Sequence, residues 1–184
     1  MIIRTTFRSI LFVMPLAALF LSACTKEDQE KLQPTAELNM LYQSIAFSLD
    51  SGGAAGYMEI TLSFDGNALG QVLSDNHYTL SQLKEFRFTQ ANLHLVTPEG
   101  GNYDPLGSIA LQLALANGTA VTVAQLNPVP DGTGTLALQL GDVNVADIIR
   151  DSNVQLTAMV QLDGPMPATS EHTLDLGAKV VVQL

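Results

Sequence analysis

Three histidines carry most of this chain's potential for metal binding or general base chemistry. None of His77, His94 and His172 lies three or four residues from another, so no local pair is preorganised for zinc. His94 lies on the face of its segment opposite two leucines, where we expect exposure to solvent. His172 comes shortly after Met166, and a copper site made of these two soft ligands is an alternative. The spacing itself assigns no metal ligands and no cofactor.

Residues 50–53 read Asp-Ser-Gly-Gly and resemble the nucleophile motif of chymotrypsin-like serine proteases. That family has glycine where this chain has Leu49, and its histidine comes well before the serine, whereas no histidine precedes Ser51. A glycine-rich hairpin turn explains the segment better. The chain also contains no Gly-x-Ser-x-Gly elbow, no phosphate-binding loop and no His-Glu-x-x-His pair. The sequence therefore predicts no catalytic residues, and a hydrolase is the third of our functional hypotheses.

The acidic turns are candidate calcium sites, because carboxylate and amide oxygens are the usual ligands of calcium. The candidate side chains are Asp65, Asn67, Asn102, Asp104, Asp131 and Asp163. None of them follows the Asp-x-Asn-x-Asp-Gly calcium loop, and Asx-Gly pairs are common in β-turns for conformational reasons. A calcium ion bound by separate loops therefore stays an alternative.

A sugar-binding platform is disfavoured by composition, because such platforms stack sugars on exposed aromatic side chains. Aromatic residues make up only 6% of the chain, and several phenylalanines lie on expected core faces. The residues that could still contribute are Tyr42, Tyr57, Tyr78 and Tyr103.

The overall charge of the chain argues against a nucleic-acid partner. Eighteen acidic and eight basic residues give 184 residues a net charge of −10. Neutralising phosphates requires clustered lysine and arginine, which this composition does not supply. A 47% apolar composition at this length suits one folded domain.

The N-terminus has the pattern of a secretory signal peptide. Arg4 and Arg8 precede an uninterrupted apolar run over residues 10–21. A helix of twelve residues rises roughly 18 Å, which is short of the ~30 Å hydrocarbon core of a membrane. We therefore interpret residues 1–23 as a cleaved signal rather than a membrane-spanning anchor.

Leu21-Ser22-Ala23-Cys24 resembles the lipobox of bacterial lipoproteins, and Cys24 is the single cysteine of the chain. The resemblance implies cleavage after Ala23 and attachment of a diacylglyceryl group to the Cys24 sulfur. Two or three acyl chains anchor a protein lastingly, whereas one chain does so only marginally. The resemblance thus implies that the membrane is a partner through a lipid anchor.

Lys26-Glu27-Asp28 resembles the export signal of surface-exposed lipoproteins in the Bacteroidota. This implies display on the outer face of the outer membrane, and the periplasmic face is the alternative location. An ordinary charged tether is the other interpretation of the three residues. We expect a lipidated cysteine and polar tether over residues 24–37 and a single domain over 38–184.

Residues 78–95 are similar to a stretch of the MbnP-like periplasmic copper-binding proteins. The similarity covers under a tenth of the chain, and tryptophan, which is abundant further along in those proteins, does not occur here. The resemblance implies copper as a metal for the chain.

A period of two dominates the remaining sequence. Apolar and polar residues alternate over 60–64, 111–115, 121–123, 136–140, 154–162 and 174–184. Such alternation indicates half-buried strands. Turn-forming clusters at 50–53, 98–102, 117–118, 128–134 and 163–167 separate them. Asn117-Gly118 predicts a type I′ hairpin.

Two short segments have helix signals. Thr79 to Gln82 fits a capping box before Leu83 and Phe86. Asn144 could cap a helix over residues 145–150. We therefore predict an all-β antiparallel sandwich, immunoglobulin-like or jelly-roll-like, of seven to nine strands with one or two short helices; a closed barrel is its main rival.

These features predict a non-catalytic outer-membrane lipoprotein whose β-sandwich serves binding, adhesion or assembly. Its partners would be other envelope proteins in an outer-membrane complex, or an extracellular ligand. The alternative is an envelope lipoprotein that binds calcium or copper.

Overall fold

The computed structural model describes residues 34–50, 55–65, 67–115, 118, 120–150, 154–166 and 168–184. Ala23, Cys24 and the predicted export signal Lys26-Glu27-Asp28 lie outside the described residues, as does Ser51. Residues Thr35–Leu184 form one compact unit. Its first strand begins at Thr35, within the stretch that the sequence assigned to the tether.

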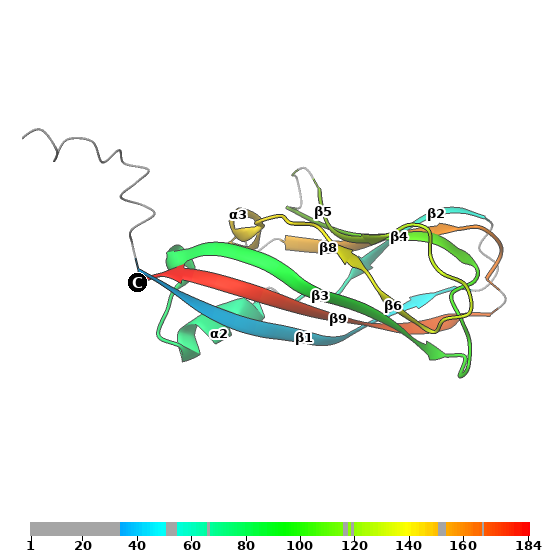
Figure 1. Cartoon of the computed structure of the whole chain (residues 1–184), viewed down its shortest axis with the longest axis horizontal. Coiled ribbons are helices and arrows are strands. Elements are labelled where there is room, and N and C mark those ends of the chain that lie inside the picture. The colour runs from blue at the N-terminus through cyan, green and yellow to red at the C-terminus, as the bar shows by residue number, and fades with distance from the viewer. Residues whose placement is uncertain are drawn as a thin grey trace, which may run out of the picture. The chain divides into compact units, whose positions relative to one another are not determined.

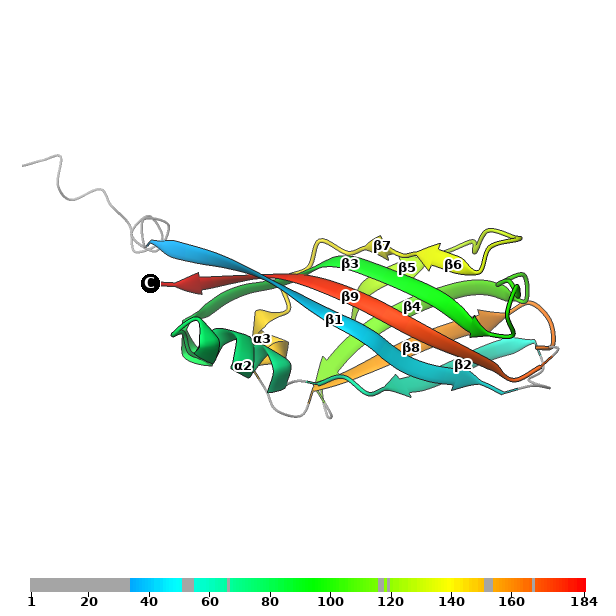
Figure 2. The same ribbon diagram turned by 90° about the horizontal axis from the view of Figure 1, so that it is seen from below.

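Within the described ranges, nine strands form two antiparallel sheets, which face each other as two layers (Figures 1 and 2). The first sheet contains, in spatial order, β1 (Thr35–Leu49), β9 (Ser170–Gln183), β3 (Leu83–Thr97) and β6 (Thr135–Ala137). The second contains β2 (Gly56–Leu62), β8 (Val154–Leu162), β4 (Leu106–Leu115), β5 (Val121–Leu126) and β7 (Gln139–Leu140). The predicted all-β sandwich of seven to nine strands is confirmed.

The strand pairing is nested, as in a jelly roll. β1 pairs with β9, β2 with β8, β3 with β6, and β4 with β5. The chain thereby alternates between the sheets from β1 to β4 and again from β8 to β9, and the first strand pairs with the last. An immunoglobulin sandwich instead pairs its first strand with its second. Of the two topologies expected from the sequence, the order matches the jelly roll.

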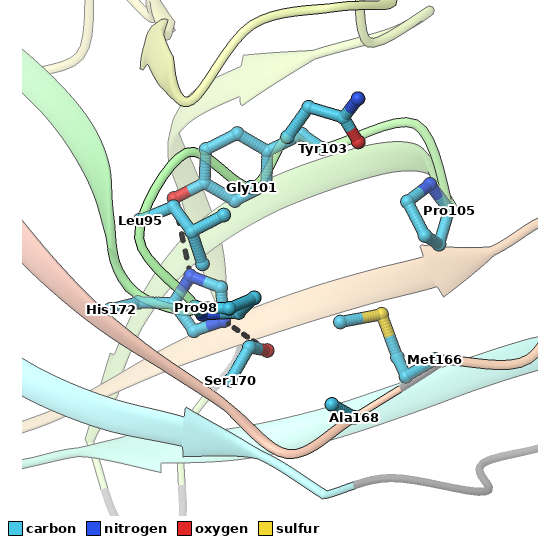
Figure 3. A pocket seen from close by; sticks show the side chains of 10 residues that line it. Leu95, Pro98, Gly101, Tyr103, Pro105, Met166, Ala168, Ser170 and His172 are labelled. Atoms are coloured by element: carbon cyan, nitrogen blue, oxygen red, sulfur yellow. Dashed lines mark hydrogen bonds between the residues drawn. The ribbon is translucent and has the colours of Figure 1, made fainter.

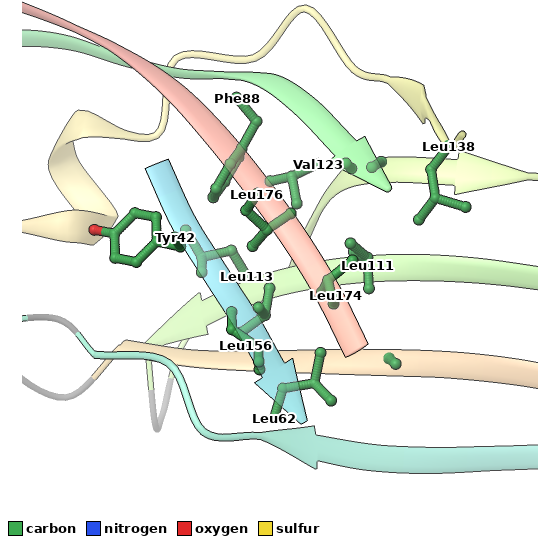
Figure 4. Close-up of a cluster of buried hydrophobic side chains, with 14 of the residues drawn as sticks. Tyr42, Leu62, Phe88, Leu111, Leu113, Val123, Leu138, Leu156, Leu174 and Leu176 are labelled. Atoms are coloured by element: carbon green, nitrogen blue, oxygen red, sulfur yellow. The ribbon is translucent and has the colours of Figure 1, made fainter. Parts of the chain in front are cut away.

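The core lies between the sheets, where the alternation of each strand places its apolar face. In β8, Leu156, Ala158, Val160 and Leu162 are buried, whereas Gln155 is exposed. Leucines from β2, β4, β8 and β9 meet in the middle of the sandwich (Figure 4). The period of two in the sequence is therefore the direct consequence of one buried and one solvated face per sheet.

The alternating segment at residues 136–140 does not form a single strand. β6 pairs with β3 in the first sheet, and β7 pairs with β5 in the second. Leu138 lies between them, is buried, and donates its backbone N–H to the Ala91 carbonyl at 2.9 Å. The segment crosses from one sheet to the other along one side of the sandwich.

Helix α2 (Asn67–Asp75) has no counterpart among the expected elements. The Asp65 carboxylate accepts the Asn67 N–H at 2.9 Å, at the start of the helix, and Leu69 and Leu73 bury one face. The helix ends in a Schellman arrangement: the N–H of Tyr78 donates to the Leu73 carbonyl at 2.8 Å, and that of His77 to Ser74 at 3.0 Å.

The helix expected after Thr79 is only the 3-10 turn η1 (Leu80–Gln82), in which the Thr79 N–H donates to Gln82 Oε1 at 3.0 Å. Leu83 and Phe86 begin β3 instead, because pairing with β9 and burial of the apolar face outweigh the local capping signal.

The second expected helix is confirmed as α3 (Ala146–Ile149), with Val145 rather than Asn144 at the N-cap position. Asn144 Oδ1 accepts the N–H groups of Ala146 at 3.1 Å and Phe86 at 3.0 Å, so this side chain ties α3 to β3. Strands β4 and β5 pair as the predicted hairpin requires, but Asn117 lies outside the described residues.

Among the described residues, no helix is long and apolar enough to cross a membrane.

Candidate functional site

A small cavity lies at one end of the sandwich, which we call the loop end. Here β1, β3 and β8 finish and β9 begins, as the partners Leu49 and Ser170 show. The cavity has a volume of about 120 Å³ and is partly enclosed. Its lining comes from the end of β3, the β3–β4 loop, the β8–β9 loop and the start of β9 (Figure 3): Leu95, Pro98, Gly101, Asn102, Tyr103, Pro105, Met166, Ala168, Ser170 and His172.

Three polar side chains form a hydrogen-bonded chain at this cavity (Figure 3). The Tyr103 hydroxyl lies 3.1 Å from His172 Nδ1, and the Ser170 Oγ lies 2.8 Å from His172 Nε2. Each of the three residues is only 1% exposed. Because Ser170 and His172 are two residues apart in β9, they share its inward face. Both ring nitrogens of His172 thus have a partner inside the protein.

Two aromatic rings flank the imidazole of His172. The Phe47 ring stacks on it with centroids 5.0 Å apart, and the Tyr103 ring with centroids 5.6 Å apart. Phe47 is the register partner of His172 in β1, and Leu95 is its partner in β3. The sheet therefore fixes the ring position of His172 from both sides, and the β3–β4 loop adds Tyr103.

Burial keeps the hydrogen-bonded chain neutral near pH 7. Removal from water lowers the pKa of His172 to about 4 and raises the pKa of Tyr103 well above its usual range. Among the described residues, no aspartate, glutamate, lysine or arginine lines the cavity. The site is thus an uncharged pocket in a strongly acidic protein.

The β3–β4 loop that carries Tyr103 is held in place by backbone contacts. The Tyr103 N–H donates to the Thr133 carbonyl at 2.9 Å. A Cβ atom at Gly101 would lie 2.8 Å from Leu95 Cδ2 and 2.9 Å from the Pro98 carbonyl oxygen, so only glycine fits there without a shift. The close packing of this loop against β3 explains why Tyr103 can reach His172.

The three histidines of the sequence do not converge. His172 and Met166 line the same cavity, as a copper site would require. His77 lies just after α2 with a φ of 64°, and α2 begins just after the end of β2 that lies away from the cavity. His94 lies on the outer face of β3, where the alternation predicted exposure to solvent, but it is half-buried, with Nε2 3.6 Å from Asp175 Oδ2.

The side chains of the acidic turns form hydrogen bonds with backbone N–H groups and with one another. Asp104 Oδ1 accepts the Gly132 N–H at 2.6 Å, and its Oδ2 accepts Asn102 Nδ2 at 2.8 Å. Asp65 accepts the N–H at the start of α2. In the described part of the chain, no three histidine, cysteine, aspartate or glutamate side chains are grouped closely enough to hold a metal ion.

The four tyrosines do not make a common surface. Tyr42 and Tyr103 are buried, Tyr78 is half-buried, and Tyr57 is 76% exposed on β2. The Tyr42 ring packs against Phe64 with centroids 4.8 Å apart, at the edge of the leucine cluster (Figure 4). These positions provide no shared stacking platform for a sugar.

Sequence reasoning found His172 and Met166 but missed Ser170 and Tyr103 as their companions. The i, i+2 spacing of Ser170 and His172 in an alternating strand was a usable signal. Tyr103 lies 69 residues from His172 along the chain, so no local pattern could have paired them.

No protein-family model and no curated protein matches the chain.

Proposed function

We propose that the protein is a non-catalytic lipoprotein of the bacterial outer membrane, whose sandwich binds a ligand or an envelope partner at its loop end. The anchor is the lipid on Cys24, and Lys26-Glu27-Asp28 directs the chain to the cell surface. The observation that carries the binding role is the uncharged, partly enclosed cavity around Ser170, His172 and Tyr103.

The position of the cavity at the far end of β1 supports a binding site that lies away from the anchor. β1 runs for 15 residues from Thr35 to Leu49, and Leu49 pairs with Ser170 of the cavity. At ~3.4 Å per residue this distance is roughly 45–50 Å. An anchor that precedes Thr35 in the chain therefore joins the domain at the end opposite the cavity. The covalent connection to the anchor therefore does not run through the loop end.

The chemistry of the cavity favours binding over hydrolysis, although Ser170 and His172 have the separation of a nucleophile and its base. In a serine hydrolase, a carboxylate at the other ring nitrogen stabilises the imidazolium that forms. Here that partner is the neutral phenol of Tyr103, and burial lowers the pKa of His172 to about 4. Such an imidazole is a weak base, and its charged form would be buried between two aromatic rings.

Two measurements test the proposal. The mass of the protein from its native envelope should show the acyl increment, and Cys24→Ser should abolish both the increment and membrane attachment. Protease added to intact cells should digest the domain if it faces outward. An unmodified wild-type mass, or a domain that survives protease on intact cells but not on lysed ones, would remove the anchor or the surface location respectively.

Copper binding is the second candidate, because Met166 and His172 line one cavity. A copper ion there would have to displace Tyr103 or Ser170 from a ring nitrogen. Titration with Cu(I) and Cu(II), followed through the His172 imidazole resonances, tests this directly. Melting with and without EDTA tests for a structural calcium or copper ion, since removal of a bound metal should lower the midpoint.

A further inference from the structure

The size of the cavity restricts what it can hold. Its volume of about 120 Å³ is close to that of an apolar cavity of about 150 Å³ that accommodates benzene. A single six-membered ring, or an aliphatic group of similar size, therefore fits, whereas a disaccharide or a nucleotide does not. The occupant is a small molecule or the single-ring end of a larger one.

The walls of the cavity restrict the charge of the occupant. Leu95, Pro98, Pro105 and Met166 supply apolar surface, and Met166 faces the His172–Ser170 side across the cavity (Figure 3). In the part of the chain that the structure describes, no ionised side chain lines the cavity to compensate a buried ligand charge. A carboxylate or ammonium group would lose its hydration without gaining a partner of opposite charge. The lining selects neutral molecules.

The hydrogen-bonded chain supplies one polar contact whichever tautomer His172 adopts. Two hydroxyls and a neutral imidazole carry three polar hydrogens, and the two hydrogen bonds use two of them. If Nε2 carries the proton, the hydroxyl hydrogen of Ser170 remains; if Nδ1 carries it, that of Tyr103 remains. Both residues line the cavity, so one O–H donor is left for an acceptor inside it.

We infer that the loop-end cavity binds an uncharged ring-sized molecule that carries one hydroxyl or carbonyl oxygen. The ring lies against Leu95, Pro105 and Met166, and its oxygen accepts the spare hydrogen of Ser170 or Tyr103. The inference rests on the proposed binding function and names its ligand class. It does not depend on the anchor, because the cavity is formed wholly within residues 95–172.

Four probes test the inference on the full chain purified in mild detergent, with the detergent alone as the blank. Phenol and toluene are neutral at pH 7, whereas benzoate and benzylammonium are charged. We expect phenol to bind about tenfold more tightly than toluene, the worth of one hydrogen bond, and the two ions to show no binding at the same concentration. Phenol should also shift the His172 imidazole resonances.

A matched pair of variants locates the contact. Only the hydroxyl that carries the spare hydrogen donates to the ligand, so one of Tyr103→Phe and Ser170→Ala should weaken phenol binding up to about tenfold, and both should leave toluene binding within about twofold. Tyr42→Phe is the control, since Tyr42 is a buried tyrosine outside the cavity, and it should change neither affinity. If a variant fails to fold, the comparison of four probes on the wild-type chain still decides the inference.

The inference is wrong if no neutral ring binds, or if benzoate or benzylammonium binds as tightly as phenol. It is also wrong if Tyr42→Phe weakens phenol binding as much as the cavity variants do. These outcomes are distinct from a failure of the anchor, because the acyl mass of Cys24 and envelope fractionation are measured without any ligand.

Discussion

The hydroxyl of Tyr103 and Nδ1 of His172 lie 3.1 Å apart, although the two residues are 69 positions apart in the sequence. Tyr103 comes from the β3–β4 loop, and His172 from the second position after the start of β9. The same hydrogen bond therefore fixes the imidazole and holds the loop that closes the cavity. A substitution of either residue should therefore disturb both the imidazole position and the β3–β4 loop.

The stability of the protein should fall on acidification between about pH 6.5 and pH 4 because of His172. Its folded pKa of about 4 lies below the unfolded value of 6.5, so the unfolded chain binds more protons in this window and stability is lost as the pH falls. The loss reaches about 3 kcal/mol at the acid end.

Denaturant unfolding of wild type and His172→Gln at pH 7, 5.5 and 4.5 measures this loss. The variant starts less stable at pH 7, because it disturbs two hydrogen bonds, but its stability should depend less steeply on pH than that of the wild type. Parallel pH dependences for the two proteins would show that His172 does not titrate as described.

Loss of the side-chain hydroxyl should affect the free energy of unfolding differently at Tyr42 and Tyr103. The Tyr42 hydroxyl is buried and has no hydrogen-bond partner among the described residues, so Tyr42→Phe should leave the free energy of unfolding unchanged or raise it by about 1 kcal/mol. Tyr103→Phe removes a partner of His172 and should lower it by about 1–2 kcal/mol. Urea unfolding of both variants makes each the control of the other, and equal effects would contradict the difference in their hydrogen bonding.

The strands were predictable because each of them buries one face along its length. Residues 154–162 and 174–183 alternate over most of their length, and each lies in a single strand of the sandwich. The segment around Leu138 alternates equally well, yet the chain changes sheets there. Local alternation records which side chains are buried but not which sheet receives them.

The helices and the site were less predictable because they depend on distant partners. Thr79 has a sound capping signal, but pairing of Phe86 and Phe88 with β9 converts the next residues into a strand. Leu69 and Leu73 of α2 are spaced as in a helix, but the segment is too short for a clear period. Tyr103 joins His172 only through the nested pairing that brings the β3–β4 loop to the start of β9.

His77 should be replaceable by glycine with a gain in stability. It occupies the position after α2 that requires a left-handed backbone, with a φ of 64°, and its side chain is exposed. Glycine adopts this conformation without a Cβ penalty, so His77→Gly should raise the free energy of unfolding by about 1 kcal/mol. Thermal and urea unfolding measure the gain. His77→Val is the matched control and should destabilise, because a β-branched residue tolerates a positive φ poorly; a glycine variant no more stable than the valine variant would contradict the capping role.

Asn144 should be the polar residue on which the packing of α3 depends most. Its Oδ1 accepts the N–H groups of Ala146 and Phe86, and its Nδ2 donates to the Lys84 carbonyl at 3.0 Å. Asn144→Ala leaves these backbone groups without their partner and should lower the free energy of unfolding by about 2–3 kcal/mol. Asn144→Asp keeps the acceptor and loses only the donor, so its cost should be smaller. Hydrogen exchange at the Phe86 and Ala146 amides separates the two variants. The alanine variant should expose both amides to exchange, and the aspartate variant should protect them. Equal protection in both variants would show that other contacts keep α3 in place.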